Sequence, residues 1–153
     1  MPFVSQELIE KTWKAVAVSS EQQILKMQRN HQKKQQALTY FAFSHLLDLR
    51  EEAAGVGIYV YHVVLFAFSR VSPKPGRVKR VQIEQYIDAG IRVEEYDPIA
   101  KIAESSEPHV LRYVYEALTE YEDEVVLSDT EQAEIFNTLN LVVSCLHDSC
   151  VRA

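Results

Sequence analysis

The run AAGVGIYVYHVVLFAFS at residues 53–69 contains no charged residue, and this run decides the fold class. Glu52 and Arg70 bound it on either side. A segment of this length, with aromatic and branched apolar side chains on every face, is typical of a helix that is buried all round. We therefore predict a central helix over residues 49–70, with the rest of the chain packed around it.

Two other interpretations of this run remain open. Residues 58–64 would suit a buried strand by propensity, although the sequence has no second run of this kind to pair with it. A membrane span needs about 20 predominantly apolar residues, and this run of 17 contains His62 and two glycines. The basic stretch that follows would suit the cytoplasmic side of a membrane. We expect a buried helix and no membrane.

Helix-start signals place further helices on both sides of the central one. The capping candidates are Ser5, Ser20 with Gln23, Asp97 before Pro98, Ser106, and Ser128 with Glu131. Asp48 with Glu51 is a similar pair that separates the central helix from the one before it. The predicted helices cover residues 6–18, 20–47, 49–70, 79–89, a short segment from 98, 107–124 and 129–149.

The predicted helix over residues 20–47 has an unusual stripe along one side. Its members recur at three- and four-residue steps and are Ile24, Gln28, His31, Gln35, Leu38, Ala42, His45 and Leu49. The stripe is apolar at its ends and polar in its middle. We expect the polar middle to leave the core or to face another chain, which would support a homodimer.

These signals together predict an all-α fold in a single domain over residues 1–153. The architecture we expect is an irregular helical bundle of four main helices, at 20–47, 49–70, 107–124 and 129–149, with short flanking helices. Only 4 glycines and 5 prolines are present, too few for a sandwich or barrel with many tight turns. Close approach of another helix would explain Ala53, Ala54, Gly55 and Gly57.

The cysteines and the first residues indicate a cytoplasmic protein. Cys145 and Cys150 lie five positions apart, which on one helix turns them about 140° from each other and disfavours a disulfide. Free thiols fit a reducing compartment. The opening Met-Pro-Phe-Val-Ser-Gln-Glu has neither a basic start nor an apolar signal region.

Charge is divided unevenly between the two parts of the chain. Residues 1–83 carry 12 Lys/Arg against 6 Asp/Glu, a net of +6, whereas residues 84–153 carry 4 against 16, a net of −12. Five of the basic residues fall within eleven positions, and we call them the basic loop: Arg70, Lys74, Arg77, Lys79 and Arg80. Such a group could hold nucleic-acid phosphates, or it could be a solvated loop that pairs with the acidic part.

The acidic part carries tyrosines, the residue type that is enriched at binding surfaces. The partner-binding residues that we predict there are Tyr113, Glu116, Glu120, Tyr121 and Glu124. A cluster of carboxylates can steer a basic partner protein during encounter. Eight acids surround the turn between the last two predicted helices, and they are Glu116, Glu120, Glu122, Asp123, Glu124, Asp129, Glu131 and Glu134. The dipole at the start of the last helix explains two or three of them but not all eight.

Catalytic and metal-binding motifs are weak in this sequence. His31 and His45 lie fourteen apart on one predicted helix, too far from each other to share a metal ion. We expect His62 to be a core histidine that bonds to a neighbouring hydroxyl. His147 and Cys150 lie one turn apart, as an activated thiol requires, but at a helix end without an evident pocket. We therefore predict no catalytic residues, no metal and no cofactor.

The function that we predict is a non-enzymatic interaction or regulatory protein, such as an adaptor, an inhibitor or an immunity-type module. It would bind a basic protein partner through the acidic, tyrosine-bearing face. Two alternatives are a nucleic-acid-associated regulator that uses the basic loop and a small enzyme with a site between the central helices. That site would be gathered from His45, His62 and tyrosines.

Overall fold

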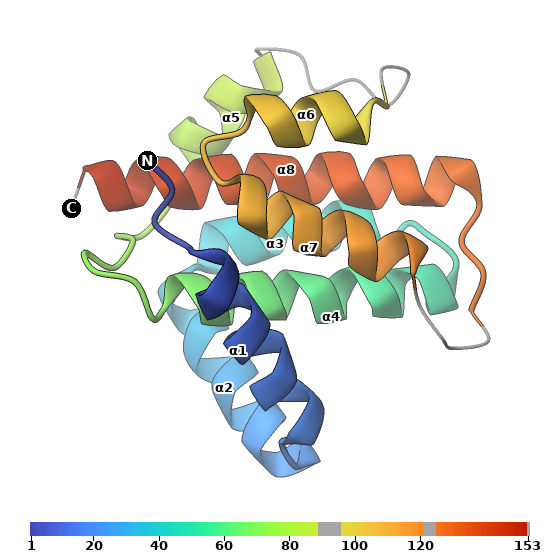
Figure 1. Cartoon of the computed structure of the whole chain (residues 1–153), viewed down its shortest axis with the longest axis horizontal. Helices are drawn as coiled ribbons and strands as arrows, with labels where there is room; N and C mark the ends of the chain where they lie inside the picture. The colour runs from blue at the N-terminus through green and yellow to red at the C-terminus, as the bar shows by residue number, and fades with distance from the viewer. Residues whose placement is uncertain (89–95, 121–124, 153) are drawn as a thin grey trace.

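The computed structural model describes residues 1–88, 96–120 and 125–152, and in these residues the protein consists of helices and contains no strand (Figure 1). The all-α prediction is therefore confirmed, and the strand interpretation of residues 58–64 is wrong. The eight helices in this part of the chain are α1 (Gln6–Val18), α2 (Glu21–Lys34), α3 (Gln36–Leu46), α4 (Glu51–Phe68), α5 (Arg80–Asp88), α6 (Pro98–Glu104), α7 (Pro108–Thr119) and α8 (Asp129–Val151).

Helix α4 lies at the centre of the packing, as its sequence predicts. It contacts α1, α2, α3, α7 and α8, and every residue from Val60 to Phe68 is buried. Among the described helices it is long and apolar enough to cross a membrane by length and composition, but 67% of its apolar window is buried inside the protein. Neighbouring helices thus cover most of its apolar side chains.

Helix α8 is the second long element and packs against α3, α4, α5 and α7. Its start is fixed by the predicted capping box, in which Ser128 Oγ accepts from the Glu131 N–H and Glu131 Oε1 accepts from the Ser128 N–H. The equivalent box of Ser20 and Gln23 starts α2. These two starts are set by residues three positions apart in the chain.

The predicted helix over residues 20–47 is in fact two helices, α2 and α3, separated at Gln35. This residue leaves helical geometry, with φ −126° and ψ 57°, and its side chain is buried. Its amide nitrogen donates to the carbonyl of Gly76, and its amide oxygen accepts from the N–H of Val78, both at 2.9 Å. At the break, the side chain of Gln35 thus forms hydrogen bonds to backbone groups of the α4–α5 connection. Because these groups lie more than 40 residues away in the sequence, no short-range pattern predicts the contact.

Two residues of the polar middle of the stripe, His31 and Gln35, pack within the same chain, so the expectation that they leave the core is wrong. The ring of His31 lies against Phe66, with centroids 4.9 Å apart, and burial lowers its pKa to about 4, with a smaller contribution from the charge of Lys34. Gln32 bonds to His62 on α4. A homodimer stays a prediction.

Two predicted helix starts are also wrong. Helix α4 follows Arg50, not Asp48, and α7 follows Glu107, not Ser106. Neither side chain caps its own helix: the Arg50 guanidinium has only donors, whereas the first N–H groups of a helix need an acceptor, and the Glu107 carboxylate accepts from Phe3 and Val4 instead. Pro108 at the first position of α7 needs no partner for a backbone donor.

The glycines of α4 differ in their surroundings. A Cβ on Gly57 would lie 2.8 Å from Leu46 Cδ2 and 3.5 Å from Ile135 Cγ1, whereas a Cβ on Gly55 would meet nothing within 4 Å. The predicted close approach is therefore confirmed at Gly57 and wrong at Gly55.

This difference predicts opposite responses to alanine. Gly55→Ala should stabilise the protein by about 1 kcal/mol, because alanine is the better helix former and its methyl group has room. Gly57→Ala gains the same propensity but overpacks the buried Leu46, so it should be about 1–3 kcal/mol less stable than Gly55→Ala. Urea unfolding monitored by circular dichroism measures both free energies. Equal stabilisation by the two variants would contradict the close packing at Gly57.

Candidate functional site

A groove of about 850 Å³ lies between α1, α4 and α7. We call it the acidic groove, and its lining residues are Trp13, Ala17, Glu52, Gly55, Val56, Tyr59, Val60, Tyr113, Glu116, Ala117, Glu120 and Val125. The volume lies in the upper part of the range of ligand-binding sites, about 300–1,000 Å³. Helices far apart in the sequence form it, since α1 packs on both α4 and α7.

Three aromatic side chains give the acidic groove its apolar surface. Trp13 and Tyr59 remain 37% and 44% exposed, which is high for large apolar side chains. Tyr113 is more deeply placed, and burial raises its pKa, with a further contribution from Tyr59. The small residues Ala17, Gly55 and Ala117 lie among the aromatic ones, so the groove stays open between the rings.

Carboxylates border the same apolar surface. Glu116 and Glu120 are exposed; Glu116 lies in the last turn of α7, and Glu120 is the residue that follows this helix. Glu52 comes from the first turn of α4. Neither Glu116 nor Glu120 has an ion-pair partner among the residues described. On the aromatic side, Lys14 Nζ lies 5.7 Å from the Trp13 ring centroid. The groove therefore combines exposed aromatic rings with two carboxylates, Glu116 and Glu120, that have no ion-pair partner among the described residues.

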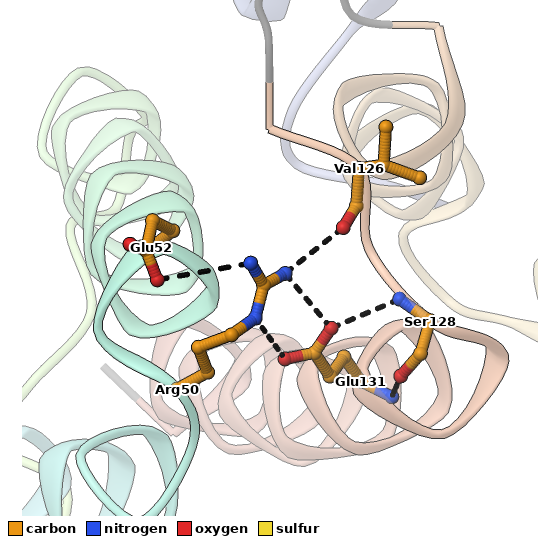
Figure 2. A network of polar contacts seen from close by, with 5 residues as sticks. All are labelled: Arg50, Glu52, Val126, Ser128 and Glu131. Atoms are coloured by element: carbon orange, nitrogen blue, oxygen red, sulfur yellow. Dashed lines mark hydrogen bonds and ion pairs between the residues drawn. The ribbon is translucent and has the colours of Figure 1, made fainter.

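Arg50 ties one end of the groove to the start of α8 (Figure 2). Its guanidinium donates to both carboxylate oxygens of Glu131 at 3.1 Å and to the carbonyl of Val126 at 2.9 Å. Arg50 Nη1 also lies 3.7 Å from the carboxylate oxygen Oε2 of Glu52, which lines the groove. The Arg50 hydrogen bonds are the largest cause of a low pKa for Glu131, about 2, and the Ser128 N–H adds to the effect.

This network predicts a pH-dependent contribution to stability. Because the pKa of Glu131 is depressed in the folded protein from its usual 4.5, the contribution is complete above pH 4.5 and is lost as the pH falls towards 2. Arg50→Gln should raise the pKa of Glu131 towards its usual value, as seen in an NMR titration of the carboxyl carbon. Arg80→Gln, which removes a separate exposed ion pair with Glu84, should leave that pKa unchanged. An unchanged Glu131 pKa in Arg50→Gln would contradict the network.

The structure brings together three of the five predicted partner-binding residues. Tyr113, Glu116 and Glu120 line the acidic groove, whereas Tyr121 and Glu124 lie outside the described residues. Sequence analysis missed Trp13, Tyr59 and Glu52. On α1, Thr12 is buried, whereas Trp13 remains 37% exposed. No local signal links residue 13 to residue 116, so these members could be found only from the packing of α1 on α4 and α7.

The basic loop lies at the opposite end of the molecule from the start of α8 (Figure 1). All five of its basic side chains are exposed. Arg80 pairs with Glu84 at 3.1 Å, and Arg77 donates to the Lys33 carbonyl at 3.5 Å. Within the described ranges, Arg70, Lys74 and Lys79 have no ion-pair partner. Among the described residues, the basic loop thus forms no ion pair with the carboxylates of the acidic groove, although Arg50 pairs with Glu131 across the fold.

The histidines of the alternative enzyme site lie in different surroundings. His62 is buried, its Nδ1 lies 2.9 Å from the Ile58 carbonyl, and its Nε2 lies 3.2 Å from the amide nitrogen of Gln32. Since the carbonyl accepts and the amide nitrogen donates, Nδ1 carries the proton, and burial lowers the pKa of the ring. Its partners are thus a carbonyl and an amide, not the expected hydroxyl. His45 is exposed and stacks on Phe41.

The thiols do not have the surroundings of activated nucleophiles. Cys145 and Cys150 are free and buried, and burial raises their pKa values to about 12 and about 11. A reactive thiol needs a lowered pKa and access to substrate. In the part of the chain that the structure describes, no group of three or more His, Cys, Asp and Glu residues could hold a metal ion.

His147 takes part in a buried network instead of activating Cys150. Its Nδ1 lies 2.6 Å from Glu107 Oε2, and the Glu107 carboxylate also accepts from the N–H groups of Phe3 and Val4 at 2.8 and 3.0 Å. Glu107 is 1% exposed. The network joins the first residues, the start of α7 and the end of α8, so its arrangement is that of a structural clamp.

Comparison with known proteins found no matching family model, no matching curated protein and no matching solved structure.

Proposed function

We propose that this chain is a non-enzymatic interaction or regulatory protein, such as an adaptor, an inhibitor or an immunity-type module. It binds a basic segment of a partner protein in the acidic groove, with apolar side chains of that segment on Trp13 and Tyr59. Glu116 and Glu120 pair with its Lys or Arg residues. The observation that carries this proposal is that exposed aromatic rings lie in one groove with Glu116 and Glu120, two carboxylates for which the described residues provide no ion-pair partner.

The chemistry of the groove supports a basic partner with apolar residues. Aromatic side chains in desolvated pockets often dominate the energy of protein interfaces. Carboxylates around them accelerate the encounter with a basic partner and exclude acidic ones. A purely charged partner would leave the rings exposed, and a purely apolar one would leave the carboxylates without counterions.

The scaffold and the charge distribution are part of the same proposal. The unit of α2 and α3, together with α4, α7 and α8, would be the four main helices of an irregular bundle that holds the groove open. Helix α4 has 18 residues, a rise of about 27 Å. Glu52 lies in its first turn and Arg70 follows its last residue by two positions, so the basic loop begins at the opposite end of α4 from the groove residue Glu52. We place the protein in the cytoplasm, which the two free thiols support.

Trp13 provides the test, because it is the single tryptophan of the chain and it lines the groove. Titration with an amphipathic peptide of lysine and leucine should shift its fluorescence, with an affinity that falls as salt is added. The triple variant E52Q/E116Q/E120Q should weaken binding by about tenfold, because exposed ion pairs each contribute about 0.2–1 kcal/mol.

The matched control is E10Q/E21Q/E104Q, which removes the same number of exposed carboxylates outside the groove. It should bind the peptide nearly as well as the unchanged protein. Equal weakening by both triple variants would show that only net charge matters, and the proposed site would be wrong.

The basic loop favours one alternative function, nucleic-acid association. Its supporting observation is that Arg70, Lys74 and Lys79 are exposed without ion-pair partners in the described residues. Binding to a DNA duplex should then weaken steeply with salt and be lost in R77E/K79E/R80E. Absent binding at low ionic strength would exclude this alternative.

A further inference from the structure

The basic charge of the chain is concentrated in two segments that contain no acidic residue. Residues 22–47 and 53–83 together carry nine Lys/Arg and no Asp/Glu, whereas the rest of the chain carries 7 Lys/Arg against 22 Asp/Glu. Five of the nine form the basic loop. The other four lie on α2, and we call them the α2 cations: Lys26, Arg29, Lys33 and Lys34. All four are exposed, and none has an ion-pair partner in the ranges that the structure describes.

Contacts across more than 40 positions of the sequence hold the end of α2 beside the basic loop. The guanidinium of Arg77 donates to the Lys33 carbonyl at 3.5 Å. The side chain of Gln35, the residue that follows α2, bonds to the backbone of Gly76 and Val78 at 2.9 Å. The α2 cations and the basic loop therefore adjoin, and together we call them the basic surface. Because like charges held close together repel, this arrangement suits a ligand that carries many negative charges.

Helix α2 turns its cations away from the core. Lys26, Arg29 and Lys33 recur at three- and four-residue steps, so they are neighbours on one side of the helix. Ile24 and Met27 lie on the opposite side and pack against the core. No residue of α2 is fully buried. The helix therefore adds little to the core, and its main contribution to the exposed surface is charge.

We propose that the basic surface binds the phosphate backbone of duplex DNA, with the α2 cations and the basic loop on the same duplex. Exposed Lys and Arg residues hold phosphates through charge and counterion release. Neither α2 nor residues 69–79 contain Phe, Tyr or Trp, on which the bases of a single strand would stack. The apolar side of α2 packs on the core, so it is not free to enter a bilayer as a membrane-bound amphipathic helix does.

This inference rests on the nucleic-acid alternative and deepens it, because it adds a second element, α2, to the site. It also gives a role to the break at Gln35, which places the end of α2 against the α4–α5 connection. The acidic groove has no part in it, since no residue of the basic surface lines that groove.

Fluorescence anisotropy of a labelled DNA duplex, titrated with the full chain at several salt concentrations, tests the proposal. The variant K26Q/R29Q/K33Q should weaken binding at least about tenfold. It should also reduce the slope of log K against log salt by about 3, because each lost phosphate contact reduces that slope by about 1. Glutamine is a good helix former, so the helical circular dichroism of the variant should match that of the unchanged protein.

The matched control is K11Q/K14Q/R112Q, which removes three exposed cations of α1 and α7 and gives the same net charge. It should leave the slope nearly unchanged, and an equal reduction in both triple variants would overturn the proposal. Binding lost in R77E/K79E/R80E but unchanged in K26Q/R29Q/K33Q would overturn the role of α2 and leave the basic loop as the site. No binding at low ionic strength would overturn nucleic-acid association itself. Tighter binding to phosphatidylserine vesicles than to the duplex would overturn the choice of DNA.

Discussion

Replacing Glu107 with glutamine should destabilise the protein by about 3–5 kcal/mol, the usual cost of breaking a buried ionic network by changing one member. The carboxylate is 1% exposed and accepts hydrogen bonds from the Phe3 and Val4 N–H groups, with His147 at 2.6 Å. Glutamine preserves the volume but turns an NH₂ group towards at least one donor. Urea unfolding monitored by circular dichroism measures the change.

Two further measurements make the Glu107 prediction specific. Glu104→Gln makes the same chemical change on an exposed residue of α6, so its stability should change by less than about 0.5 kcal/mol. Hydrogen exchange of the Phe3 and Val4 amides should accelerate in Glu107→Gln and stay slow in Glu104→Gln. If Glu107→Gln unfolded at the same urea concentration as the unchanged protein, the clamp would have no structural role.

Replacing Phe136 with alanine should also destabilise the protein by about 3–5 kcal/mol, through lost burial and the cavity that remains. Phe136 is fully buried on α8, and its ring centroid lies 5.6 Å from that of Tyr96. Helix α8 packs against α3, α4, α5 and α7, so neighbours on several sides would have to move to close the cavity. The free energy of unfolding in urea measures the loss.

Val126→Ala is the control for this substitution, since Val126 is 81% exposed and its truncation should cost less than about 0.5 kcal/mol. Phe136→Leu should fall between the two, because it removes less volume. A loss under about 1 kcal/mol in Phe136→Ala would mean that the core around α8 collapses to fill the space, contrary to the dense packing described here.

Local residues determined most helix positions. The capping boxes at Ser20 and Ser128 join positions three apart, and Asp97 with Pro98 starts α6 in the same way. The uncharged run at 53–69 had to be buried, because leaving so many apolar side chains in water costs more than one chain of this size can offset. Such signals depend on neighbours along the chain, so the sequence alone was sufficient to predict them.

Contacts between residues far apart in the sequence decided where α2 ends, how α7 begins and which residues line the acidic groove. Gln35 interrupts a helical pattern because its amide bonds to the backbone at Gly76 and Val78, and Glu107 leaves its own helix uncapped to bind Phe3, Val4 and His147. The acidic groove likewise joins Trp13, Tyr59 and Glu116 from three helices. Spacing along the chain predicts which residues share a helix face, but only packing decides which faces meet. The sequence alone therefore determined the helices and their charges, whereas the tertiary structure decided which side chains form a site.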